Sequence, residues 1–148
     1  MVPSNLRHFK PSEFRHPELV NADFVNWLDS VRDAADTKMI LTSDARLLNE
    51  NRKASGSSSR SLHLSGWAVD MRLPSRAREI WNIVAAVVLR SVTEAELQGE
   101  LRRRANHELP AITYGSVELE LVHGPTDRHI HVGIDKNTSF HELILADD

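Results

Sequence analysis

The stretch "SLHLSGWAVD", Ser61–Asp70, places a histidine and an aspartate seven positions apart, with a glycine and an alanine between them. His63 and Asp70 are both side chains that can bind a metal ion. The stretch as a whole shows neither one clean face of a helix nor the strict alternation of a strand. We therefore expect the stretch to begin as a loop and to close as a strand over residues 68–73.

The composition limits which class of protein this chain can belong to. With 148 residues, of which 41% are hydrophobic and 26% charged, the chain is long enough for a buried core, and we expect one domain over residues 1–148. The net charge of −3 argues against nucleic acid as a partner. The longest apolar run, Ile83–Leu89, is too short to cross a membrane and suits a buried helix. Nothing in the sequence indicates an oligomer.

The sequence contains no cysteine, which excludes disulfides, thiolate zinc sites and cysteine nucleophiles. Any metal ion must therefore be held by nitrogen and oxygen atoms, and the eight histidines make such a site possible. The first residues lack the apolar segment of a cleaved secretory signal, so we expect synthesis in the cytoplasm.

Periodicity predicts helices in the first part of the chain and strands in the last part. The expected helices cover Pro17–Ala35, residues 75–92 and Thr93–Asn106, and the expected early strand is Lys38–Ser43. Asn51–Ser61 is rich in serine and is expected to be a flexible loop. Ile112–Gly124 alternates as one strand, and "RHIHVGI" returns beside it as the second strand of a hairpin. The predicted class is α+β, with a small antiparallel sheet and a C-terminal β-hairpin packed against helices.

Metal-capable side chains recur in the predicted hairpin. Alternate residues of a strand point to the same side, so His129 and His131 should share one face. A catalytic zinc site needs three nitrogen or oxygen ligands and one open position. Spacing alone leaves two interpretations open: His63, Asp70 and His131 form such a site, or the histidines are ordinary packing and surface residues.

Three motifs resemble one family. "SLHLSGWAVD" matches every defined position of the Ser-x-His-x-x-Gly-x-Ala-x-Asp signature of the M15 zinc peptidases. "ILTSDAR" resembles that family's strand ending in Ser-x-x-Arg, and "HIHVGI" resembles its His-x-His strand. The family includes D-alanyl-D-alanine carboxypeptidases and dipeptidases and phage L-alanyl-D-glutamate endolysins. It shares its fold with the hedgehog signalling domain, so the resemblance implies a hedgehog-like fold.

The resemblance also implies the ligands of a Zn²⁺ ion. His63 and Asp70 would be two of them, and His131 the third, because the family's last ligand typically precedes a short apolar strand such as "VGI". Gly66 and Ala68 would keep the backbone between the first two ligands small, and glycine permits a strained turn.

Other residues receive roles from the same resemblance. His129 would lie beside the open coordination position and would donate to an oxyanion or carry a proton. Arg46 would bind a carboxylate of the substrate, unless it forms a surface salt bridge. Ser61 would contribute to the substrate site through a hydrogen bond, unless it is an ordinary loop serine.

The general base is where this sequence departs from the family. Many relatives have Asp or Glu three residues before the last histidine ligand, and that position is Arg128 here. We predict that Asp127, one residue further back, takes this role. Glu118 and Glu120 on the paired strand are the alternatives.

The resemblance implies a zinc peptidase that hydrolyses peptide bonds in the stem peptides of bacterial peptidoglycan. It would be of the D-Ala-D-Ala carboxypeptidase or the L-Ala-D-Glu endopeptidase type. A phage endolysin, released to the cell wall by lysis or carried in a virion, fits best; a cytoplasmic dipeptidase also fits. Arg128 keeps an alternative open, a catalytically impaired zinc-binding module that recognises wall peptide or a protein partner. A structural protein whose histidines never meet is the third possibility.

Overall fold

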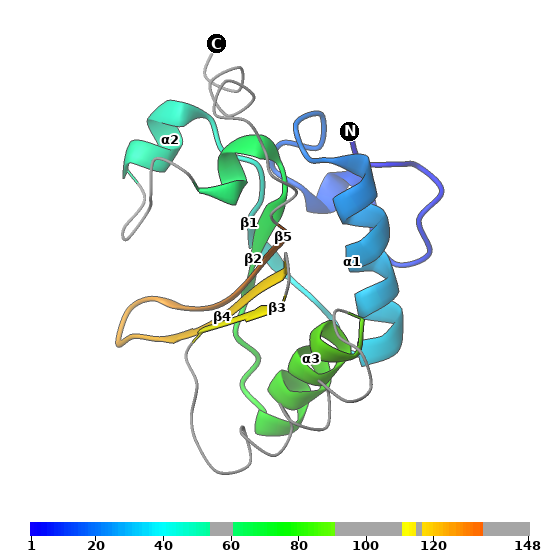
Figure 1. Ribbon diagram of the computed structural model, residues 1–148, viewed down its shortest axis with the longest axis vertical. Coiled ribbons are helices and arrows are strands. Elements are labelled where there is room, and N and C mark those ends of the chain that lie inside the picture. The colour runs from blue at the N-terminus through cyan, green and yellow to red at the C-terminus, as the bar shows by residue number, and fades with distance from the viewer. Residues whose placement is uncertain (54–60, 91–110, 115–116, 135–148) are drawn as a thin grey trace.

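The computed structural model describes residues 1–53, 61–90, 111–114 and 117–134 (Figure 1). Its helices are α1 (Ala22–Ala35), α2 (Leu48–Lys53) and α3 (Ala77–Leu89), with 3₁₀ turns η1 (Pro11–Glu13) and η2 (Leu62–Ser65). Its strands are β1 (Leu41–Ser43), β2 (Ala68–Arg72), β3 (Ala111–Tyr114), β4 (Val117–His123) and β5 (Arg128–Ile134).

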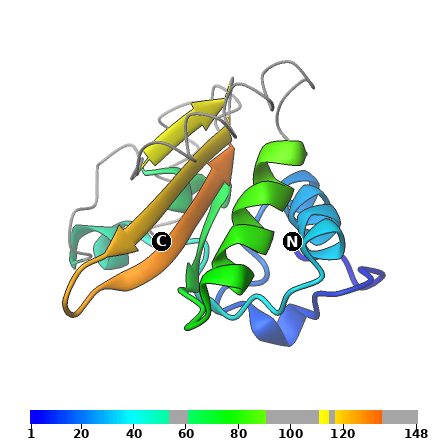
Figure 2. The same cartoon turned by 90° about the horizontal axis from the view of Figure 1, so that it is seen from below.

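The strands form one five-stranded sheet in the order β1-β2-β5-β4-β3, and every neighbouring pair is antiparallel. Helices α1 and α3 lie side by side on one side of the sheet, while α2 lies on the other side (Figures 1 and 2). This arrangement confirms the predicted α+β class and the hairpin of β4 and β5.

Helix α1 begins at a capped residue. The Asn21 side chain accepts hydrogen bonds from the backbone N–H groups of Asp23 and Phe24, which satisfies donors that a helix start leaves unpaired. The helix therefore begins at Ala22 and not at Pro17, where periodicity alone predicted it. The apolar periodicity that predicted the helix is borne out within it, since Phe24, Leu28 and Val31 are fully buried.

The sheet has two chemically different faces. Val69 lies opposite Val132, and Met71 lies opposite Ile130, and all four side chains are buried in the core. Because successive strand residues point to opposite faces, the residues between them point away from this core. This places polar side chains of β2, β4 and β5 together on the face away from α1 and α3.

Two predicted elements need correction. Residues 51–53 of the predicted loop close helix α2, a short helix that the serine-rich composition obscured. The predicted single strand Ile112–Gly124 is two strands, β3 and β4, which pair with each other so that Tyr114 lies opposite Val117. The near-continuous apolar and polar alternation of the sequence concealed the division into two strands.

Other predictions fall outside the described residues, among them the helix Thr93–Asn106 and most of the serine-rich loop. The predicted helix over residues 75–92 is confirmed over Ala77–Leu89, and the early strand is confined to Leu41–Ser43. In the part of the chain that the structure describes, no helix is long and apolar enough to cross a membrane.

Candidate metal centre

His63 is held in a short turn by bonds at both ends of its backbone and at its ring. Ser61 caps η2, and its Oγ accepts from the His63 backbone N–H at 3.3 Å. The His63 backbone carbonyl accepts from the Arg46 N–H at 2.8 Å. The ring is buried, and its Nδ1–H donates to the carbonyl oxygen of Asp44 at 2.7 Å. Nε2 is therefore the ring nitrogen that faces the rest of the site.

Gly66 ends this turn with φ of +78°, a left-handed conformation that side chains other than glycine rarely adopt. This confirms the expected strained turn. A Cβ at this position would also lie 2.2 Å from the carbonyl oxygen of Leu19. The Gly66 carbonyl accepts from the backbone N–H of Asn21 at 2.9 Å. The glycine thus lets the turn pack directly against the chain that leads into α1.

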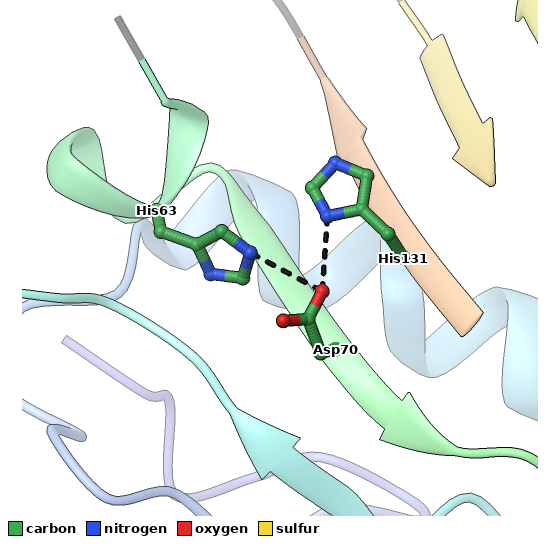
Figure 3. Close-up of side chains that lie close together, drawn as sticks. All are labelled: His63, Asp70 and His131. Atoms are coloured by element: carbon green, nitrogen blue, oxygen red, sulfur yellow. Dashed lines mark hydrogen bonds and ion pairs between the residues drawn. The ribbon is translucent and has the colours of Figure 1, made fainter. Parts of the chain in front are cut away.

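Asp70 and His131 are brought together by strand register. They lie directly opposite each other on β2 and β5, so their side chains share the face away from the helices. The Oδ1 atom of Asp70 lies 3.0 Å from Nδ1 of His131 and 3.2 Å from Nε2 of His63 (Figure 3). The ligand atoms of the three residues all lie within 4.8 Å of one another.

The electrostatics of this group favour positive charge at its centre. Burial tends to raise the pKa of Asp70, but hydrogen bonds from His131 and His63 outweigh it and hold that pKa well below its usual range. Burial tends to lower the pKa of His131, but hydrogen bonds to Asp70 and Glu118 outweigh it and raise that pKa to about 9. The ionised carboxylate of Asp70 therefore stabilises the protonated form of His131.

The donor set fits a zinc ion. Two imidazole nitrogens and one carboxylate oxygen match the three protein ligands of a catalytic zinc site. Because Nδ1–H of His63 is donated to the Asp44 carbonyl, Nε2 is the nitrogen that can turn a lone pair toward a metal ion beside the negative Asp70 Oδ1. A cation between these two atoms would offset the buried negative charge.

His129 flanks the three residues, and Asp127 holds it there. Nε2 of His129 lies 3.8 Å from Oδ1 of Asp70, on the same face of β5 as His131. The other ring nitrogen, Nδ1, lies 2.7 Å from Oδ1 of Asp127. His129 and Asp127, which received separate roles from the sequence, thus lie in contact, with the imidazole nearer the candidate ligands and the carboxylate behind it.

Arg46 lies in the site, but its partners are protein groups. Its Nη2 pairs with Asp70 Oδ2 at 3.0 Å, and its Nε donates to Ser43 Oγ at 3.1 Å. Its Nη1 donates to Asn51 Oδ1 at 3.4 Å. The side chain is mostly buried, so its ion pair with Asp70 does not lie at the surface, where the alternative placed it. Its predicted contact with a substrate carboxylate stays a prediction.

The remaining candidate carboxylates differ in their contacts and in their exposure to solvent. Glu118 on β4 places Oε1 3.1 Å from Nε2 of His131. Glu120 lies opposite His131 in register but is exposed, and no described residue pairs with its carboxylate. Arg128, at the position where relatives have an acid, is also exposed.

Sequence reasoning missed the support that Asp44 gives to the site. The Asp44 side chain is buried and accepts from the backbone N–H groups of Arg15 and His16, which fixes the carbonyl that holds His63. A backbone carbonyl carries no residue-type signal, so no motif could reveal this contact. The sequence signal nearest to it is Asp44 in "SDAR", an acidic residue that directly follows a predicted strand.

Comparison with known proteins agrees with this geometry. The sequence model of the Peptidase M15 family matches residues 7–105, a stretch that includes Arg46, His63 and Asp70. No curated protein and no solved structure gave a significant match. The match covers more than half of the chain, and the chain belongs to the Peptidase M15 family of zinc peptidases.

Proposed function

We propose that this peptidase is zinc-dependent and hydrolyses peptide bonds in the stem peptides of bacterial peptidoglycan, as a phage endolysin-type enzyme. The observation that carries the proposal is the convergence of His63, Asp70 and His131, whose ligand atoms lie within 4.8 Å of one another on one polar face of the sheet. Membership of the family supports a peptidase, and the type of bond is proposed from the resemblance of the motifs.

In this proposal His63, Asp70 and His131 hold the ion. A bound zinc ion would polarise the scissile carbonyl and make water acidic enough to act as a nucleophile near neutral pH. The three residues come from η2, β2 and β5, and each has an outer contact that limits its movement. Such support keeps the ligand atoms in place when substrate enters.

His129 is the residue that we propose moves the proton. With Nδ1–H donated to Asp127, the lone pair of Nε2 is free to accept a proton and later to return it to the leaving amine. A protonated Nε2 could also donate to the oxyanion that forms on the attacked carbonyl. Asp127 acts as the base only through this ring, since its contact in the structure is with His129 and not with the ligands.

Arg46 and Ser61 are proposed to bind substrate, and each has only some of its hydrogen-bonding groups left for this role. Arginine has five N–H donors, and three are used by Asp70, Ser43 and Asn51. A substrate carboxylate would have to bind the remaining two. Ser61 Oγ already accepts from His63 with one of its two lone pairs, so its hydroxyl hydrogen and its second lone pair are left for substrate.

The direct test is metal analysis of the purified protein followed by incubation with purified peptidoglycan. We expect one zinc ion per chain and the release of new amino groups, both lost in His63→Ala. We expect His129→Ala to keep the zinc ion and to lose most of the activity. His8→Ala is the matched control, because that histidine pairs with Asp33 on the surface and should change neither quantity.

Mass spectrometry of the digested muropeptides identifies the bond. Loss of the terminal D-alanine indicates a carboxypeptidase, and a new N-terminal D-glutamate indicates the L-Ala-D-Glu endopeptidase. Stoichiometric zinc without turnover on any muropeptide would contradict the hydrolase and support the zinc-binding module. Absence of zinc binding would contradict both.

A further inference from the structure

Glu118 contacts the candidate metal centre from behind one of its ligands. It lies on β4 opposite Gly133, which puts it diagonally across from His131 and on the same face of the sheet. Its Oε1 accepts from Nε2–H of His131 at 3.1 Å. The side chain of Glu118 is about half exposed, at 44%, whereas the His131 side chain is 15% exposed.

The two nitrogens of His131 face different partners. Nδ1 is directed at Asp70 Oδ1, where His63 also converges, and Nε2 is directed at Glu118. The two nitrogens lie on different edges of one ring. A carboxylate that holds Nε2 therefore lies away from the position where the three ligand atoms meet.

We propose that Glu118 is a positioning residue that fixes the ring orientation of His131 and makes Nδ1 its metal-binding atom. This inference rests on the proposed zinc site. An oxygen that accepts from the outer N–H of a ligand histidine selects the tautomer and holds the orientation of the ring. His63 is fixed in the same way by the Asp44 carbonyl, with the opposite choice of nitrogen.

This role competes with a role as general base, which the sequence also allowed for Glu118. A base would have to leave His131 and contact water at the reacting centre. A positioning residue needs only an acceptor oxygen at Oε1, and glutamine supplies one. Substitution by glutamine and by alanine therefore separates the two roles.

The test measures zinc affinity by competition with a chromophoric chelator in Glu118→Ala and Glu118→Gln. Glu120→Gln and Glu120→Ala are the matched controls, because Glu120 lies on the same strand and face, opposite His131, without a pairing partner among the described residues. We expect Glu118→Ala to lose about 10- to 100-fold in zinc affinity, the usual effect of removing such a partner. Glu118→Gln should weaken zinc no more than Glu120→Gln does.

Turnover at saturating zinc gives the second readout. A positioning role predicts that Glu118→Gln keeps most of the wild-type kcat. The proposal is overturned if Glu118→Ala binds zinc as well as Glu120→Ala does, or if Glu118→Gln binds as weakly as Glu118→Ala. It is also overturned if Glu118→Gln keeps zinc affinity but loses kcat, the result expected of a base. A wild-type protein that binds no zinc contradicts the proposed function itself, which the chelator assay shows before any variant is compared.

Discussion

Asp70 gives its two carboxylate oxygens to different partners. Oδ1 faces His63 and His131, and Oδ2 pairs with the guanidinium of Arg46. One oxygen is thereby left for a metal ion, while the other anchors the side chain. In the metal-free protein the same arrangement balances the buried negative charge with cationic groups on both sides.

Replacement of Arg46 by methionine should destabilise the metal-free protein. The substitution keeps an unbranched apolar stem but leaves Oδ2 of the buried Asp70 without its charged donor, at a cost of about 1–3 kcal/mol in the free energy of unfolding. Urea unfolding in the presence of chelator measures it. Arg15→Met is the control, since Arg15 pairs with Glu50 at the surface and should cost under about 1 kcal/mol. Equal losses in the two variants would show that the contact with Asp70 adds no more to the free energy of unfolding than a surface ion pair does.

The raised pKa of His131 predicts how metal-free stability changes with pH. Its pKa is about 9 in the folded protein against an ordinary value of 6.5, because the hydrogen bonds to Asp70 and Glu118 outweigh its burial. The folded state therefore binds this proton more tightly, and its contribution to stability is complete below about pH 6.5 and is lost as pH rises toward 9. Urea unfolding of chelated protein should show a fall over this range. The His131→Gln variant should show a smaller fall, and identical slopes would contradict the assignment.

The turn η2 and the start of α1 form one structural junction. Gly66 ends the turn, and its carbonyl accepts from Asn21, the residue that caps the helix. The candidate ligand His63 is therefore positioned partly by a helix that lies on the opposite side of the sheet. Close backbone packing at this point needs a residue without a side chain.

Gly66→Ala should disturb this junction more than any neighbouring substitution in the turn. An alanine would adopt a left-handed φ and place Cβ against the carbonyl of Leu19, so we expect a loss of at least about 2 kcal/mol in the free energy of unfolding. Thermal or urea unfolding measures it. Ser65→Ala is the control, because it removes only a hydrogen bond to the Leu62 carbonyl and should cost about 1 kcal/mol. A Gly66→Ala protein as stable as Ser65→Ala would mean that the backbone relaxes easily.

Local pattern predicted the elements that carry strong periodicity and missed those defined by contacts. Helices α1 and α3 have continuous apolar stripes, and the alternation of β5 placed His129 and His131 on one face. Helix α2 has six residues, too few for a stripe. The pairing of Arg46 with Asp70, and of Glu118 with His131, joins residues distant in the sequence. The register of β4 and β5 decides the second contact, and the turn between β1 and α2 decides the first. Neither can be read from the pattern of a single sequence.

The two faces of the sheet have different roles. The face toward α1 and α3 is buried and apolar, whereas the other face carries the metal-capable residues of β2 and β5. The third candidate ligand comes from η2, so the site joins separate parts of the chain. A metal ion bound there would connect these parts only in the folded state.

Zinc should therefore stabilise the protein by an amount that grows with the logarithm of its excess over the dissociation constant. A ligand that binds only the folded state adds about 2.7 kcal/mol at one hundred times the dissociation constant, because binding draws the equilibrium toward the folded form. Thermal unfolding of chelated protein, titrated with zinc, should show a Tm that rises with zinc concentration. His63→Ala removes a buried candidate ligand and should abolish the rise, whereas His8→Ala changes a surface histidine and should retain it. The site would be contradicted by a wild-type Tm that does not change with zinc concentration, or by a Tm that rises equally in His63→Ala. Either result would place any bound zinc outside the group of His63, Asp70 and His131.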